Sequence, residues 1–84
     1  MIAGGVEAGL DDATARTLAA QTLVGAAKLL AESPETAEEL RRRVTSPNGT
    51  TAAAIATFDD HGAKEALIAG VKAAAARSAE LSKP

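Results

Sequence analysis

Apolar residues recur along this chain three and four positions apart, and no segment alternates apolar and polar residues with a period of two. The first spacing gathers side chains on one face of an α-helix, whereas the second is typical of a β-strand. The sequence therefore predicts an all-α fold, a small helical bundle of about four helices. The expected helices cover 12–31, 37–44, 50–60 and 63–82, and residues 1–10 have the pattern of the end of a further helix.

Each expected helix boundary has its own local signal. Asp11 and Asp12 put negative charge at a helix start, where it interacts favourably with the helix dipole. Thr36 and Glu39 have the spacing of a capping box, in which each side chain bonds the backbone N–H of the other residue. Gly62 follows the third helix and predicts a left-handed cap at its end.

Large apolar side chains are few in this chain. Alanine dominates the apolar fraction, and the 84 residues include one Phe, one Met and no Trp, Tyr or Cys. A domain of this size buries only roughly 60% of the surface that its unfolded chain exposes, and ordering the backbone costs about 1–2 kcal/mol per residue. We therefore expect residues 1–84 to form a single helical domain that is stable only as an obligate oligomer. Ile55 and Phe58 are expected to be buried, and Gly25 to mark a close helix crossing.

Composition argues against several classes of site. Absent cysteine excludes disulfides and thiolate metal sites, and His61 is the only imidazole, so no metal site of His and Cys is expected. His61 is predicted to lie on the surface at a helix end, because no acid or nucleophile in the sequence pairs with it for catalysis. No apolar run approaches the ~20 residues of a membrane span, and no leader opens the chain, so we expect a cytoplasmic protein without a membrane partner.

Arg41, Arg42 and Arg43 form a basic run. Glu38 and Glu39 precede Arg42 and Arg43 by four residues, which predicts ion pairs along one solvated helix face. The net charge of −2 argues against a nucleic-acid surface. Two alternatives remain open: a contact of one arginine with a cofactor phosphate, and a small nucleic-acid-binding or regulatory protein.

The loop at residues 44–51, Val-Thr-Ser-Pro-Asn-Gly-Thr-Thr, ends one helix and begins another. Pro47 biases the residue before it away from the helix, and Asn48 with Gly49 tolerates the positive φ of a tight turn. The N–H groups from Gly49 to Ala52 then lack intrahelical acceptors. Such donors at the positive end of a helix dipole suit a carboxylate. The alternative is that the Ser, Thr and Asn of this loop are only helix caps.

Several motifs stand in a fixed order along the chain. They are Ala19-Ala20-Gln21-Thr22 with Gly25-Ala26-Ala27-Lys28, then Glu39-Leu40-Arg41, then the Ser-Pro-x-Gly-Thr-Thr of the loop, and lastly Ala73-Ala74-Ala75-Ala76-Arg77-Ser78-Ala79-Glu80-Leu81. Together, over about residues 6 to 81, they resemble the C-terminal domain of pyrroline-5-carboxylate reductase. Asn48 stands where glycine is usual in that family.

The resemblance implies an all-helical domain in which two copies interlock as a homodimer, with further assembly into larger rings in some members. It also implies an oxidoreductase of proline biosynthesis that reduces pyrroline-5-carboxylate to L-proline with NAD(P)H held on an N-terminal Rossmann domain. The substrate-binding residues carried over by position are Ser46, Asn48, Gly49, Thr50 and Thr51. Backbone N–H groups of Gly49, Thr50 and Thr51 would bind the substrate carboxylate, and the catalytic hydroxyl of Thr51 would bond the ring nitrogen.

This chain has no G-x-G-x-x-G fingerprint and no strand leading into one. Because the hydride donor must lie in contact with the imine carbon, we expect the chain alone to be inactive and to bind no cofactor by itself. The chain is then expected to be part of a longer reductase or a fragmentary gene product. The alternative function is a purely structural homo-oligomerisation module whose loop binds no ligand.

Overall fold

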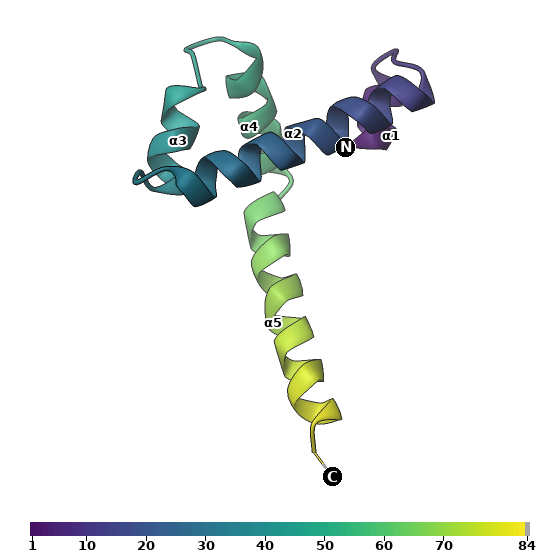
Figure 1. The fold of residues 1–84 in the computed structure, drawn as a ribbon, viewed down its shortest axis with the longest axis vertical. Coiled ribbons are helices and arrows are strands. Elements are labelled where there is room, and N and C mark those ends of the chain that lie inside the picture. Colours follow the sequence, from purple (N-terminus) through teal and green to yellow (C-terminus); the bar gives the residue numbers. More distant parts are fainter. Residues whose placement is uncertain (84) are drawn as a thin grey trace. The chain divides into compact units, whose positions relative to one another are not determined.

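A computed structural model describes residues 1–83 as five α-helices without a strand in that range (Figure 1). The all-α prediction is confirmed, and the four expected helices are present with ends within one residue of the expected ones. The helices are α1 (Ile2–Glu7), α2 (Asp12–Glu32), α3 (Ala37–Arg43), α4 (Thr50–Asp60) and α5 (Ala63–Leu81). None of the helices in residues 1–83 is long and apolar enough to cross a membrane.

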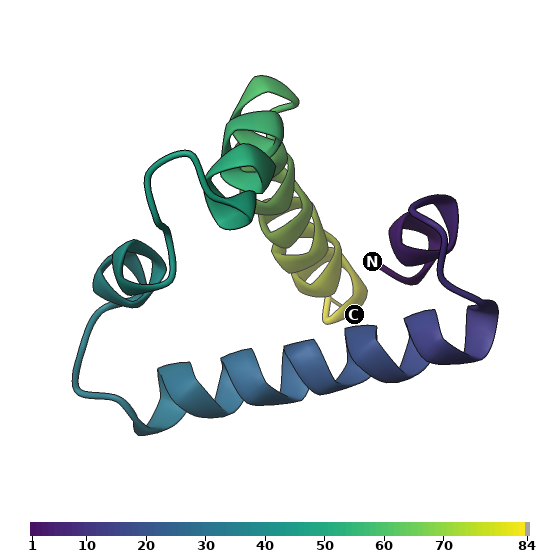
Figure 2. The same ribbon diagram turned by 90° about the horizontal axis from the view of Figure 1, so that it is seen from above.

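Contacts divide the chain into two units, Met1–Arg42 and the part from Arg43 onward. In the first unit, α1 folds back over the beginning of α2 (Figure 2). A Cβ atom at Gly5 would lie only 3.2 Å from the Cβ of Ala15, so the two helices meet where both residues are small. Ala15 is 3% exposed as a result.

The connection between α1 and α2 depends on a second glycine. Gly9 has a φ of +114°, a conformation that residues with a side chain rarely adopt. Its N–H donates to the Val6 carbonyl, and the N–H of Leu10 donates to the Gly5 carbonyl at 3.0 Å. Residues 1–10 therefore contain α1, which ends at Glu7, and a reversal before α2, and this agrees with the helix end that the sequence pattern predicted.

The predicted start of α2 is confirmed. Asp11 is the N-cap, and its Oδ1 accepts a 2.8 Å hydrogen bond from the Thr14 N–H. The Thr14 hydroxyl donates to Oδ2 of the same carboxylate. These bonds favour the charged carboxylate and lower the pKa of Asp11, with the backbone bond from Thr14 as the largest cause.

The predicted capping box of α3 is confirmed in one of its two bonds. The Glu39 N–H donates to the Thr36 hydroxyl at 3.2 Å. The Glu39 carboxylate accepts a hydrogen bond from the Arg42 guanidinium, three residues along the helix. This pair joins residues three apart, whereas the sequence spacing predicted pairs four residues apart. Both groups are exposed, and such a pair contributes only about 0.2–0.5 kcal/mol.

In the second unit, α4 ends at Asp60 with His61 as its C-cap, and α5 begins after Gly62, whose φ of +68° confirms the left-handed position. The His61 N–H donates to the Thr57 carbonyl at 3.1 Å, and Nδ1 of the ring lies 2.9 Å from the same oxygen. An imidazole with its proton on Nδ1 therefore closes the last turn of α4. The surface position predicted for His61 is confirmed.

The buried apolar residues of residues 1–83 are Ala15, Ala19 and Leu40 alone. Phe58 was expected in the core and is 57% exposed, while Ile55 is half-buried. The prediction for Phe58 is wrong for the single chain because α5 leaves α4 beyond Gly62 and no part of the described second unit covers that side. Among the described residues of its own unit, nothing lies within 4 Å of a Cβ built at Gly25, so the expected helix crossing is absent from that unit.

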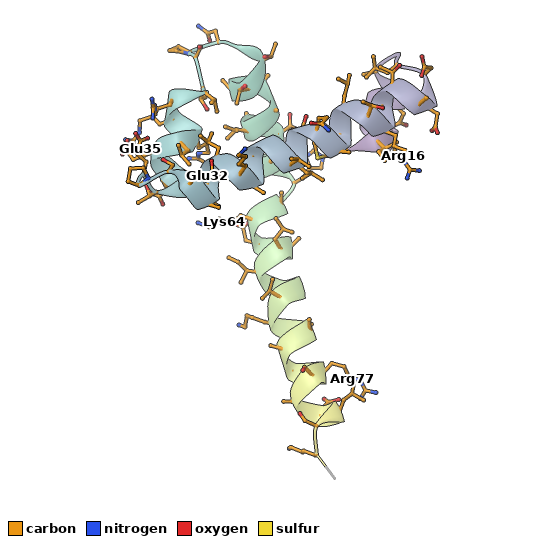
Figure 3. All side chains as sticks on the ribbon, in the orientation of Figure 1. Arg16, Glu32, Glu35, Lys64 and Arg77 are labelled. Atoms are coloured by element: carbon orange, nitrogen blue, oxygen red, sulfur yellow. The ribbon has the colours of Figure 1, made fainter. Side chains whose placement is uncertain are left out.

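Side chains of α5 are exposed along its whole length within the second unit. Leu67 is 72% and Val71 is 70% exposed, and the helix has no buried residue. Arg77, labelled in Figure 3, donates to Glu80 at 2.8 Å on the same exposed helix.

Candidate functional site

Between α3 and α4 the backbone makes a tight turn over Ser46, Pro47, Asn48 and Gly49. The Gly49 N–H donates to the Ser46 carbonyl at 3.0 Å, which closes the turn. Asn48 has a φ of +59°, the only positive φ of a non-glycine residue described. Proline at the second position, positive φ at the third and this hydrogen bond are together typical of a type II turn.

Glycine is needed at position 49 because a side chain there would be too close to Ser46, and not because of its backbone conformation. Its φ is −86°, a value open to any residue, so positive φ falls on Asn48 and not on Gly49. A Cβ atom at Gly49 would lie 3.1 Å from the Ser46 carbonyl oxygen and 3.4 Å from the Ser46 Cβ. A side chain there would press on the carbonyl that closes the turn.

Gly49 is also the N-cap of α4, and its carbonyl accepts the first helical hydrogen bond, from Ala53 at 3.1 Å. No side chain bonds the cap. In the described part of the chain, the N–H groups of Thr50, Thr51 and Ala52 have no protein acceptor. Three backbone donors therefore stand together at the positive end of an 11-residue helix.

The two threonines at this helix start differ in exposure. Thr50 is exposed, and Thr51 is half-buried together with Ala52. Neither hydroxyl is bonded to another group within residues 1–83, in contrast to Thr57 of the same helix, whose hydroxyl donates to the Ala53 carbonyl. Thr51 thus combines a hydroxyl that is open to a ligand with a partly desolvated position.

The structure gathers the predicted site residues Ser46, Asn48, Gly49, Thr50 and Thr51 in one turn and the helix start after it. One detail requires correction. The Gly49 N–H was expected to face a ligand, but the Ser46 carbonyl already accepts its hydrogen bond. The donors left for an anion are those of the next three residues. Sequence reasoning missed the Ser46 carbonyl as an acceptor, although proline followed by asparagine and glycine is the signal for such a turn.

Another hollow lies in the first unit and contains none of the predicted site residues. It is a groove of about 580 Å³ between α1 and α2, and Arg16, labelled in Figure 3, supplies its charged side chain. Its lining residues are Met1, Ile2, Ala3, Arg16, Ala19, Ala20 and Leu23. Within the described residues, no group of three or more acidic or imidazole side chains is placed to hold a metal ion.

Comparison with known proteins gives one consistent result. The family model described as "Pyrroline-5-carboxylate reductase dimerisation" matches residues 1–81. "Pyrroline-5-carboxylate reductase 1" of Bacillus spizizenii is 51% identical over 78 residues, which are 93% of this chain and 26% of that protein. "Pyrroline-5-carboxylate reductase" of Synechocystis sp. is 46% identical over 80 residues, which are 95% of this chain and 30% of that protein.

A solved structure agrees with these sequences. The crystal structure of Plasmodium falciparum pyrroline carboxylate reductase with NADP bound superposes with a TM-score of 0.89 at 26% identity. The superposition covers 98% of this chain and 31% of that chain. The present chain therefore spans between a quarter and a third of the length of these relatives.

Proposed function

This chain belongs to the pyrroline-5-carboxylate reductase dimerisation family, and we propose that it is the dimerisation and substrate-binding domain of such a reductase. The complete enzyme would reduce pyrroline-5-carboxylate to L-proline with NAD(P)H. Identity of 51% over 93% of the chain supports the assignment. The observation that supports substrate binding by this part is the set of three unpaired N–H groups that begins α4.

The proposed partner of the exposed apolar surface is a second copy of this chain. Only Ala15, Ala19 and Leu40 are buried apolar residues within residues 1–83, so most of the apolar surface is left for a partner, as in the chains of obligate homodimers. The residues that would supply it are large apolar side chains that remain at least 39% exposed: Met1, Ile2, Val6, Leu10, Leu18, Leu23, Val24, Leu29, Leu30, Val44, Phe58, Leu67, Ile68, Val71 and Leu81.

In the proposed binding mode, the substrate carboxylate accepts hydrogen bonds from the backbone N–H groups of Thr50 and Thr51. Hydrogen bonds to a charged group contribute about 1.5–3 kcal/mol each, and the helix dipole adds about 0.3–1 kcal/mol. Gly49 leaves the approach to these groups open because it has no side chain. The substrate ring would then lie beside the half-buried hydroxyl of Thr51.

Thr51 is the proposed catalytic residue. Its hydroxyl can donate a hydrogen bond to an imine nitrogen or accept one from its protonated form. Either bond fixes the plane of the ring and hence the face that the imine carbon presents, which is the geometric requirement for a directed reduction. Ser46 and Asn48 would contribute by forming the turn that sets the direction of these groups.

The described residues do not fit a dinucleotide. Residues 1–83 contain no strand, and a nucleotide fold binds its pyrophosphate in a glycine-rich turn between a strand and a helix. NAD(P)H would therefore bind elsewhere in the complete reductase, and this chain alone would be inactive. The contribution proposed for this chain is restricted to holding and orienting the substrate.

A titration with L-proline tests this proposal. The backbone amide signals of Thr50, Thr51 and Ala52 should shift on addition of L-proline, and the Gly49 signal should shift less because its N–H remains bonded to Ser46. Pyrrolidine, which has the ring but not the carboxylate, is the control and should leave the same amides unchanged.

A purely structural homo-oligomerisation module is the second candidate. It is favoured by the bond between Gly49 and Ser46, which makes the loop a closed turn without a ligand. If saturating L-proline shifts none of these amides in a protein shown to be dimeric, substrate binding is rejected and this alternative stands.

A further inference from the structure

The turn before α4 contains an Asn-Gly pair whose asparagine is exposed. Gly49 offers no side chain to shield its own nitrogen, and that nitrogen is four bonds from the side-chain amide carbon of Asn48, with three atoms between them. A bond between them closes a five-membered ring. Asn48 is the only asparagine of the chain, and Gln21 is the only other side-chain amide. Any loss of a side-chain amide from this turn can therefore be assigned to Asn48.

We propose that Asn48 is a site of spontaneous deamidation. The Gly49 nitrogen loses its proton and attacks the side-chain carbon of Asn48, forming a carbon–nitrogen bond and a cyclic imide while ammonia leaves. Water then opens the imide at either carbonyl. One opening gives aspartate, and the other gives isoaspartate, in which the main chain runs through the former side chain. No oxidant or reductant is needed, and water is the only co-reactant.

The folded turn controls the rate of this reaction. The Gly49 nitrogen can attack only when its 3.0 Å bond to the Ser46 carbonyl has opened and the left-handed backbone at Asn48 has relaxed. This bond is a single backbone bond in an exposed loop, and such bonds open more readily than those of packed helices. Unfolding removes the restraint completely, so the unfolded chain reacts faster than the folded one.

Both products place a carboxylate immediately before the N-cap of α4. The three unpaired N–H groups that follow would then face a fixed negative charge from the protein itself. Isoaspartate also lengthens the main chain by one carbon within the turn, which moves the cap relative to Ser46. The consequence for substrate, which rests on the proposed function, is weaker binding of a carboxylate at Thr50 and Thr51.

Peptide mapping tests the modification without reference to activity. The purified protein is held in mildly alkaline buffer, sampled over time and cleaved with trypsin, which releases residues 44–64 as one peptide and 17–28 as another. We expect the first peptide to gain one mass unit and to resolve into two products. The peptide containing Gln21 should stay unchanged. The rate should rise about tenfold per pH unit, because the attacking nitrogen must be deprotonated.

The matched control is Asn48→Gly, which fits the positive φ and has no amide to lose. It should show neither the mass gain nor the extra negative charge. The proposal is overturned if peptide 44–64 stays unchanged in the folded protein over a period many times longer than the one in which a denatured sample converts, or if neither sample converts.

A second measurement separates this proposal from the proposed function. Asn48→Asp should bind L-proline about fivefold to tenfold more weakly than Asn48→Gly, as expected for a like charge a few ångströms away in water. If neither the unmodified wild type nor Asn48→Gly binds L-proline while wild-type peptide 44–64 deamidates, the proposed function fails and the deamidation site stands.

Discussion

Replacing Leu67 by alanine distinguishes a self-sufficient chain from one completed by a second copy. In the single chain the Leu67 side chain is 72% exposed on a helix without buried residues. Its loss there should change the free energy of unfolding by less than about 0.5 kcal/mol, and alanine even has the higher helix propensity. If a second copy covers α5, the same change removes a buried leucine from each chain.

The magnitude follows from the cost of truncating a buried leucine, about 2–5 kcal/mol. Two such losses per dimer amount to at least about 4 kcal/mol, which raises the dimer dissociation constant about a thousandfold or more. Sedimentation analysis across a dilution series measures that constant. Helical circular dichroism on the same samples reports whether the chains remain folded as they separate.

The control for Leu67 is Lys64→Ala, which shortens another exposed side chain of α5 (Figure 3). It should leave the dissociation constant within about twofold, as expected for a surface change of under about 0.5 kcal/mol. A dimer equally tight in wild type and Leu67→Ala would refute burial of this face of α5 by a second copy. A wild-type chain that is folded and monomeric at high dilution would refute the oligomer altogether.

Gly49→Ala should destabilise the protein by about 1 kcal/mol, because the added Cβ presses on the Ser46 carbonyl and weakens its hydrogen bond with the Gly49 N–H, which is of comparable strength. Chemical denaturation measures this change in the free energy of unfolding. A variant more stable than wild type would contradict the steric role of Gly49. Gly25→Ala should stabilise an α2 that no other helix crosses by about 1 kcal/mol, because alanine has the higher helix propensity. If helices cross at Gly25 in a dimer, the added methyl group should instead weaken the dimer by about 1–3 kcal/mol. A higher dimer dissociation constant for Gly25→Ala would therefore place a helix crossing at this residue. Asp11 has a lowered pKa in the folded state, so its charged cap stabilises above the unfolded pKa of about 3.9 and loses that contribution as the pH falls through the lower folded value. Asp11→Asn keeps a capping oxygen, so acid unfolding curves of the variant should show a smaller loss of stability over that range than those of wild type.

The helices were predictable because local signals fix them. The cap at Asp11, the left-handed glycine at Gly62 and the break at Pro47 act within four residues of the boundary that each one sets. Helical spacing then identifies the segments between these boundaries. The short α1 was less clear, because its end depends on the positive φ of Gly9, and sequence does not indicate which of several glycines takes that conformation.

Burial was predicted less well than helix position. Phe58 was expected inside because it is large and apolar, but hydrophobicity does not indicate which molecule covers a side chain. If a second copy covers α2 and α5, as proposed, their exposed apolar residues belong to an interface between chains rather than to an internal core. The expected helix crossing at Gly25 is absent from the described residues of its own unit for the same reason.

The sequence predicted the position of the candidate site along the chain better than it predicted which of its backbone groups are free to bind a ligand. Serine, proline, asparagine and glycine in sequence indicate a turn, and the threonines after them indicate a helix start. Which amide the turn itself uses depends on how the chain closes on Ser46, a contact between backbone atoms that leaves no mark in the side-chain pattern. The N–H of Gly49 was therefore assigned to a ligand although the turn already uses it.

The lack of any buried residue in α5 has a consequence for how the protein reaches its native state. Most of the stability of a helix in a protein comes from the packing of its apolar face, so in the proposed dimer α5 would gain that stability when two chains meet. Renaturation should then follow second-order kinetics, with a half-time that lengthens in proportion to dilution. In a cell, the first chains synthesised would remain monomeric until a second chain is available. The rate of synthesis would then set how long the apolar residues of each α5 stay exposed.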